Sequence, residues 1–296
     1  MSNLDSSQFK ESQRQNWNSV ANGWQKWWKA FEQDAQKVNE RLIELAGIEE
    51  GYRVLDIATG TGEPAITAAK KVGDKGYVLA TDISPQMLSI AKRRANSLGL
   101  ESIIEFKECD AETIDLPASF NAVLCRWGLM FFPNLITTLI NIHDLLSNSG
   151  RIAAAVWSEP AKVPKLYTAI DVVTRELGIS DSPSYSKAHS PFSLANITTL
   201  KDAFIQAGFK DVSFEYLNVI FEFASAEDYT DFAMSIIGPI QNMLANEDEK
   251  RKQEIHKVIT DEVARKYNAT ANPDDKITKG SSISMNNEAI CITGRK

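Results

Sequence analysis

Short apolar runs alternate with amphipathic stretches along residues 50–157. The apolar runs have the length and the β-branched content of buried strands, and the stretches between them repeat apolar residues with the period of a helix. We predict strands at residues 54–58, 77–81, 103–107, 122–125 and 151–157. Because strands that alternate with helices form parallel sheets, this region predicts a doubly wound, mostly parallel α/β sheet.

The segments on both sides of this core also have recognisable patterns. Residues 1–16 are polar and rich in serine and glutamine, so we expect them to fray. Residues 17–48 predict an N-terminal helical cap with aromatic side chains on one face. The remaining predictions are a helix at 194–207, strands at 212–223 and 283–293, and two helical lid or substrate-binding inserts at 158–193 and 226–280. We assign all of these elements to one domain, residues 1–296.

A glycine-rich turn follows the first predicted strand. Gly60 and Gly62 stand one residue apart, just before the helical pattern that begins at Ala65. A strand, a glycine turn and a helix N-terminus form a cradle for a cofactor, because unpaired backbone N–H groups converge there. The same spacing, with Asp82 about 20 residues further on, also fits a dinucleotide-binding fingerprint. The motif alone therefore leaves the cofactor open.

Charges around the turn favour one cofactor. Asp56 and Glu63 flank the glycines, where the pyrophosphate of a dinucleotide would dock. Close like charges in a partly desolvated site cost several kcal/mol at an effective dielectric constant of about 20. An ammonium and a sulfonium group would instead be attracted, so the pattern favours S-adenosylmethionine. An NAD(P)-dependent oxidoreductase is the alternative interpretation.

Composition excludes several other classes of function. The net charge of −7 gives no general attraction to nucleic acid. We find no secretory signal pattern, and no apolar run approaches the roughly 18 residues of a membrane span. We therefore expect a cytoplasmic protein, monomeric or homodimeric, with no integral membrane association. Metal ligation is not expected, because the cysteines and histidines are scattered: Cys109, Cys125, Cys291, His143, His189 and His256.

Four spaced segments resemble the class I S-adenosylmethionine-dependent methyltransferases, in particular the branch typified by the ubiquinone/menaquinone-biosynthesis methyltransferases. The segments are V-L-D-I-A-T-G-T-G at 54–62, A-T-D-I-S at 80–84, C-D-A-E at 109–112 and L-L-S-N-S-G-R at 145–151. The resemblance implies a Rossmann-like, seven-stranded sheet with an antiparallel last strand. The chain departs from this family pattern at Ala58, where many relatives have glycine.

The resemblance also implies where the parts of the methyl donor bind. Asp56, Gly60 and Gly62 would hold the methionine end, Asp82 the ribose, and Asp110 with Ala111 the adenine. Helix capping is the alternative role for Asp82, and a solvated loop acid is the alternative for Asp110. The full predicted cofactor-binding set is Asp56, Ala58, Thr59, Gly60, Gly62, Asp82, Ile83, Met87, Asp110, Ala111, Arg126 and Trp127.

Apolar and aromatic side chains suggest the substrate side of the site. The predicted substrate-binding residues are Trp24, Trp28, Met130, Phe131, Phe232 and Ile236. Packing of an N-terminal helix on the core is the alternative role for the tryptophans of the cap. A plug in the core is the alternative for Trp127, Met130 and Phe131. This set favours a small apolar or aromatic substrate.

Methyl transfer from a sulfonium is an in-line displacement, in which positioning and desolvation supply much of the rate. A base is needed only where the nucleophile carries a proton of high pKa, and His189 is the candidate for this role. A surface histidine is its alternative role. The sequence thus predicts a methyltransferase of a small molecule. The other interpretations are the oxidoreductase and a catalytically silent binding protein that keeps the fold.

Overall fold

A seven-stranded sheet forms the centre of the computed structural model, which describes residues 3–116, 119–179, 190–267 and 282–296. Its strand order is β3-β2-β1-β4-β5-β7-β6. The strands are β1 Arg53–Ile57, β2 Tyr77–Asp82, β3 Ile104–Glu108, β4 Phe120–Arg126, β5 Leu146–Trp157, β6 Lys210–Phe223 and β7 Ile283–Arg295. The first five run parallel, and β7 is antiparallel to both β5 and β6. The predicted fold class is confirmed.

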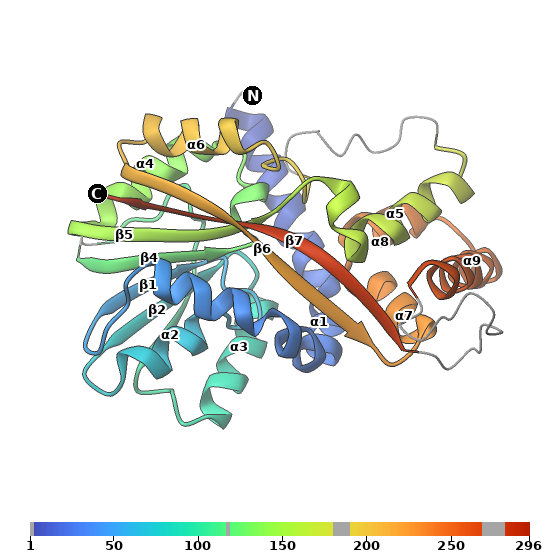
Figure 1. The fold of residues 1–296 in the computed structure, drawn as a ribbon, viewed down its shortest axis with the longest axis horizontal. Helices are drawn as coiled ribbons and strands as arrows, with labels where there is room; N and C mark the ends of the chain where they lie inside the picture. Colours follow the sequence, from blue (N-terminus) through green and yellow to red (C-terminus); the bar gives the residue numbers. More distant parts are fainter. Residues whose placement is uncertain (1–2, 117–118, 180–189, 268–281) are drawn as a thin grey trace.

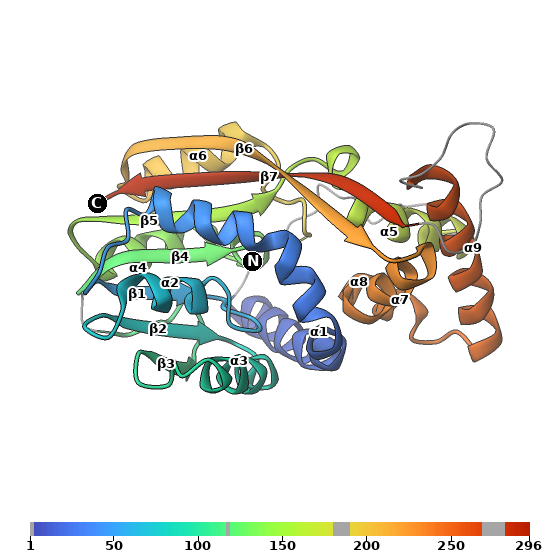
Figure 2. The same ribbon diagram turned by 60° about the horizontal axis from the view of Figure 1, so that its bottom comes forward.

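Helices cover both faces of this sheet (Figures 1 and 2). On one face lie α4 and α6, and on the other lie α2, α3 and the C-terminal part of α1. A further group, α5 and α7 to α9, packs together beside the far ends of β6 and β7. The helices are α1 Asn3–Leu45, α2 Ala65–Val72, α3 Pro85–Ser97, α4 Leu135–Leu145, α5 Pro164–Glu176, α6 Ile197–Gln206, α7 Ala226–Ile236, α8 Gly238–Leu244 and α9 Glu249–Tyr267, with short 3-10 turns η1 Leu129–Phe131 and η2 Pro160–Lys162.

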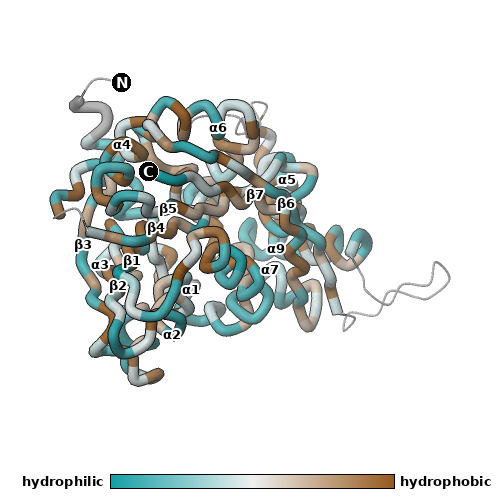
Figure 3. The backbone as a smooth tube through the Cα atoms, turned by 60° about the vertical axis from the view of Figure 1, so that its left-hand side comes forward, coloured by the Kyte–Doolittle hydropathy of each residue, from teal (hydrophilic) through white to brown (hydrophobic). Residues whose placement is uncertain are grey.

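The apolar residues that drive this fold lie mainly in the inner strands, as the hydropathy colours of β4, β5 and β7 show (Figure 3). Every residue of β5 from Ile152 to Val156 is fully buried. Such runs are typical of strands that helices cover on both faces. None of the helices in the described ranges has the length and apolarity needed to cross a bilayer.

Two predicted boundaries are wrong. The helix α1 begins at Asn3, so residues 3–16 are helical rather than frayed, and they are continuous with the predicted cap. Contacts with distant strand ends explain the extra turns, because Lys10 pairs with Asp110. The strand β5 begins at Leu146 rather than at residue 151, and in its first part the register with β4 shifts and Ser149 adopts a φ of 66°.

Two non-glycine residues with left-handed backbone stand at adjacent strand ends. Ala58 follows β1 with a φ of 56°, and Trp127 follows β4 with a φ of 57°. The two turns touch, because a Cβ added to Gly128 would lie 2.7 Å from the Ala58 Cβ. Left-handed backbone disfavours L-residues other than glycine. A glycine at position 58 would therefore suit this conformation better than alanine does.

This geometry predicts opposite outcomes for two substitutions of Ala58. Ala58→Gly should change the free energy of unfolding by less than about 1 kcal/mol, since relief of the left-handed conformation offsets the greater entropy of the unfolded chain. Ala58→Val should lower it by about 2 kcal/mol, because a β-branched residue is strained at this φ. Urea denaturation measures both. A large loss in the glycine variant, or none in the valine variant, would contradict the described turn.

Candidate functional site

A hollow opens at the carboxyl ends of β1, β2 and β4, where α/β sheets commonly bind ligands. Its empty volume is ≈ 1050 Å³, including the space at its mouth. The helix α1 lines one side with Phe9, Lys10, Gln13, Trp17, Trp24 and Phe31. The turns after the strands line the other side, so α1 forms a roof over the sheet ends.

The turn after β1 forms the floor of the hollow. Ala58, Thr59 and Gly60 line it, and the Gly60 N–H donates to the Asp82 Oδ2 at 2.8 Å. The Ser84 N–H donates to the other oxygen, Oδ1, also at 2.8 Å. These bonds fix the carboxylate at the end of β2, where it also lines the hollow. Burial raises the pKa of Asp82 to about 6, even though the backbone N–H groups oppose this shift.

Asp110 lies at one end of the hollow, after β3. Its Oδ1 accepts a hydrogen bond from the Glu112 N–H at 2.9 Å, and its Oδ2 accepts one from the Lys10 Nζ at 2.7 Å. Lys10 also pairs with the Glu112 carboxylate at 2.7 Å. The apolar side chains of Ile83 and Met87 also line the hollow. The first turns of α1 are thus tied to the strand end by charge.

A second charged group joins α1 to the end of β4. The Arg126 guanidinium donates to both oxygens of Glu32, at 2.6 and 2.7 Å, and to the Asn39 Oδ1 at 2.8 Å. The Arg126 and Glu32 side chains are only 7% and 8% exposed. Burial opposes ionisation of Glu32, but the guanidinium outweighs it and holds the pKa of that carboxyl below its usual value.

Two more acids lie beside this pair. Glu63 lines the hollow and accepts a hydrogen bond from Arg94 at 3.3 Å, and burial together with Glu32 raises its pKa. Asp56 lies beneath the floor, where its Oδ2 accepts the Ala65 N–H at 3.0 Å and its Oδ1 has no hydrogen-bond partner among the described residues. Burial raises the pKa of Asp56 to about 7. Three carboxyl groups thus face two guanidinium groups here.

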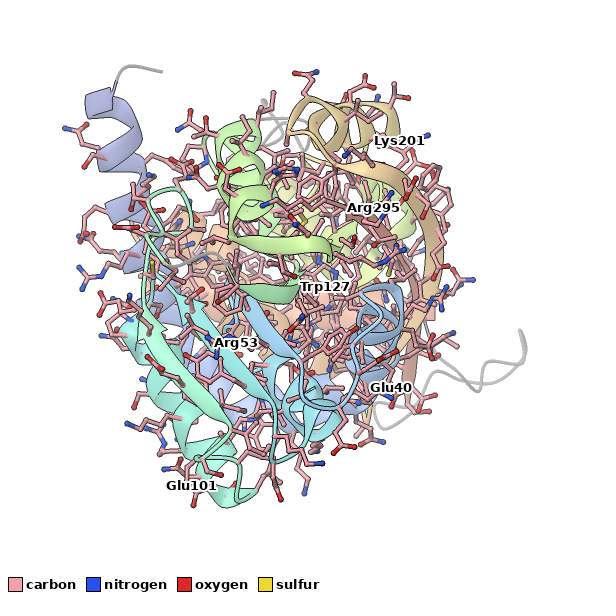
Figure 4. The ribbon with its side chains drawn as sticks, turned by 90° about the vertical axis from the view of Figure 1, so that its left-hand side faces the viewer. Glu40, Arg53, Glu101, Trp127, Lys201 and Arg295 are labelled. Atoms are coloured by element: carbon pink, nitrogen blue, oxygen red, sulfur yellow. The ribbon has the colours of Figure 1, made fainter. Side chains whose placement is uncertain are left out.

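The structure brings most of the predicted cofactor residues together. The ones that line the hollow are Ala58, Thr59, Gly60, Asp82, Ile83, Met87, Asp110, Ala111, Arg126 and Trp127. Asp56 and Gly62 lie outside its wall: Asp56 is under the floor, and Gly62 faces Ile66 and Ala91 with a φ of 106°. In the view of Figure 4, Trp127 lies near the centre of the molecule, whereas Glu101 and Lys201 lie near its outline.

The predicted substrate residues divide more evenly. Trp24 and Phe131 line the hollow. Four others lie outside its wall: Trp28, Met130, Phe232 and Ile236. Arg94 lies 4.0 Å over the Trp28 ring, and the Met130 sulfur accepts the Trp157 N–H at 3.4 Å. Both have packing partners elsewhere.

Phe232 and Ile236 belong to the core, where they are 1% and 4% exposed. The described residues of the two inserts contribute nothing to the wall of the hollow, which α1 covers instead. His189 lies outside the described residues. No group of His, Cys, Asp or Glu in the described ranges is arranged to hold a metal ion.

Several wall residues were missed because residues 1–16 look polar. Phe9, Lys10 and Gln13 all lie in this segment and line the hollow. A signal was present, since Phe9, Trp17, Trp24 and Phe31 follow one another at spacings of eight, seven and seven residues. Such spacing keeps the side chains on one helical face.

The chain is similar to known methyltransferases in sequence. Residues 48–178 match the family described as a methyltransferase domain. A ubiquinone/menaquinone biosynthesis C-methyltransferase UbiE from Pseudomonas savastanoi pv. phaseolicola is 31% identical over 203 residues, which are 66% of this chain and 75% of that protein. UbiE from Pseudomonas putida F1 is 30% identical over the same extent.

Solved structures share the fold at lower identity. A putative methyltransferase from Bacillus halodurans has a TM-score of 0.54 and 23% identity, covering 87% of this chain and 98% of that one. Phosphoethanolamine N-methyltransferase 2 from Haemonchus contortus, in complex with S-adenosylmethionine, has a TM-score of 0.54 and 16% identity, covering 90% of this chain and 56% of that one. The similarity in sequence to the UbiE proteins shows that the chain belongs to the class I S-adenosylmethionine-dependent methyltransferases.

Proposed function

We propose that this methyltransferase acts on a small apolar aromatic molecule and methylates a ring carbon of a quinol-like acceptor. The observation that carries the proposal is the aromatic part of the lining of the hollow, which we call the aromatic wall. That wall contains Trp17, Trp24, Phe31, Trp127 and Phe131. Carbon as the acceptor is supported by the named activity of the UbiE relatives, which are C-methyltransferases.

The described residues fit the nucleoside part of S-adenosylmethionine. Each oxygen of Asp82 accepts one backbone N–H and keeps a further lone pair, so the carboxylate can accept both ribose hydroxyls. Ile83 and Met87 would flank the adenine, and Asp110 would accept a hydrogen bond from its amino group. These are the residue roles that we propose for the nucleoside end.

The charges fit the cationic part of the donor. The pKa values of Asp56 and Glu63 are raised, because burial is not matched by enough positive charge nearby. Arg94 and Arg126 already form ion pairs with Glu63 and Glu32, respectively. An arriving ammonium group would supply the missing positive charge and favour the ionised acids. The anionic pyrophosphate of a dinucleotide would have the opposite effect.

The donor supplies a methyl group on a sulfonium, and the chain supplies position and a dry environment. The floor and Asp82 fix the nucleoside, and the α1 roof keeps water from the aromatic side of the hollow. Ring faces also attract a sulfonium by cation–π interaction. In-line displacement then needs only that the acceptor stack against the aromatic wall with its nucleophile toward the sulfonium.

Asp82→Asn should weaken binding of S-adenosylhomocysteine by about 10- to 100-fold at pH 7.5, since hydrogen bonds to a carboxylate contribute about 1.5–3 kcal/mol. The free carboxyl has a pKa of about 6, so the wild-type affinity should fall at pH 5, where protonation competes with binding. The variant should lack this part of the pH dependence. Titration calorimetry measures both, with Asp74→Asn on the surface as control. Equal affinities at pH 7.5 would contradict the ribose role.

The acceptor class is tested with methyl-¹³C-labelled S-adenosylmethionine and 1,4-naphthohydroquinone under reducing conditions. We expect enzyme-dependent product whose labelled methyl is bonded to a ring carbon, which ¹³C NMR separates from methyl on oxygen. Phosphoethanolamine serves as a polar control acceptor and should give no product. Label on oxygen would overturn carbon methylation, and turnover of the polar acceptor alone would overturn the aromatic class.

A further inference from the structure

Lys165 is a fully buried amine at the start of α5, with an exposed fraction of 1%. Five aromatic rings surround its Nζ. The distances to the ring centroids are 3.8 Å for Phe221, 4.2 Å for Phe31, 4.8 Å for Trp157, 5.7 Å for Trp127 and 5.7 Å for Phe232. We call these five rings the Lys165 cage. A lysine in such surroundings is unusual, because lysine is almost never fully buried without a charged partner.

Charged groups near the cage do not pair with this amine. Among the described residues, no carboxylate forms an ion pair with Lys165, although Glu32 and Asp34 of α1 attract its charge from a distance. Burial lowers the pKa of Lys165 well below its ordinary value, and Arg126 at the end of β4 adds to this effect. Its backbone groups bond to neutral side chains, Asn287 of β7 and Tyr229 of α7. The amine is therefore disposed to rest in its neutral, basic form.

The cage shares a wall with the hollow. Phe31 and Trp127 belong to both, and Trp157 stacks on Trp127 at 4.3 Å with an interplanar angle of 12°. Lys165 follows β5, whereas the nucleoside-binding acids follow β2 and β3 on the other side of β1. The ring of Phe31 or Trp127 thus separates Lys165 from the hollow. This amine lies on the side of β1 away from the acids that we assign to the nucleoside.

We propose that Lys165 is the general base for an acceptor whose nucleophile is activated by loss of a hydroxyl proton, such as a phenol or a quinol. The inference rests on the proposed function and names the group that removes the proton. Contact requires the ring of Phe31 or Trp127 to turn aside as the acceptor stacks in the hollow.

The step balances in atoms and charge. The acceptor hydroxyl gives its proton to the Lys165 Nζ, and its electron pair forms the ring carbonyl while the ring carbon attacks the methyl group. A C–C bond forms, the C–S bond breaks, and its electron pair stays on sulfur. The proton on the methylated ring carbon then passes through solvent water to the carbonyl oxygen, which restores the aromatic ring and its hydroxyl group. The positive charge that leaves sulfur thus ends on Lys165, where ring faces stabilise an ammonium by cation–π interaction.

The first test is Lys165→Met, a change to an apolar side chain of similar length. We expect kcat with 1,4-naphthohydroquinone to fall about 100-fold or more, as for loss of a general base, with affinity for S-adenosylhomocysteine unchanged. The wild-type kcat should rise with pH as the amine loses its proton, and the variant should lack that rise. Lys162→Met, at an exposed lysine three residues earlier, is the matched control. A Lys165→Met variant that retains kcat would overturn the proposal.

The second test does not depend on turnover. In protein labelled with ε-¹³C lysine, the signal that Lys165→Met removes belongs to Lys165, and its titration should lie at lower pH than that of Lys162. With S-adenosylhomocysteine bound, added 1-naphthol should shift this signal toward the ammonium position. An unchanged signal would overturn the base role. Failure of naphthohydroquinone methylation with a shifted signal would instead overturn only the carbon acceptor.

Discussion

The buried ion pair between Arg126 and Glu32 holds the roof of the site onto its floor. It joins the middle of α1 to the end of β4, with both side chains less than a tenth exposed. Breaking a buried pair by removal of one partner costs about 3–5 kcal/mol, because the other charge is left unpaired. The pair therefore fixes α1 over the sheet ends, where six residues of this helix line the hollow.

The order of the strands determines which functional groups lie at each position along the edge of the sheet. The acids after β2 and β3 suit a nucleoside, the carboxyl groups around β1 suit a cation, and the aromatic rings after β4 and β5 suit an apolar acceptor. Lys165 and its cage lie at the last of these positions. In the proposed step, the positive charge lost by the sulfonium is gained by Lys165, which lies near the same edge of the sheet.

Local patterns predicted the parts of the site that depend on neighbouring residues. Asp82 ends a short apolar strand, and the local sequence pattern predicts its position without knowledge of tertiary contacts. Lys10 was missed, because its helix is stabilised by Asp110, a hundred residues away. The role of Lys165 was missed for a similar reason, since its five rings come from four different elements and the turn after β4. Trp28 and Phe232 are aromatic, as residues that line a pocket often are, but Trp28 packs against Arg94 and Phe232 packs against Trp27.

A crystal structure with S-adenosylhomocysteine tests the central claim most directly, because it shows the donor, its orientation and the roof together. The account predicts both ribose hydroxyls within hydrogen-bond distance of the two Asp82 oxygens, the adenine beside Ile83 and Met87, and the sulfur facing the aromatic wall under α1. A ligand whose ribose does not contact Asp82, or whose sulfur points away from Phe31 and Trp127, would contradict it.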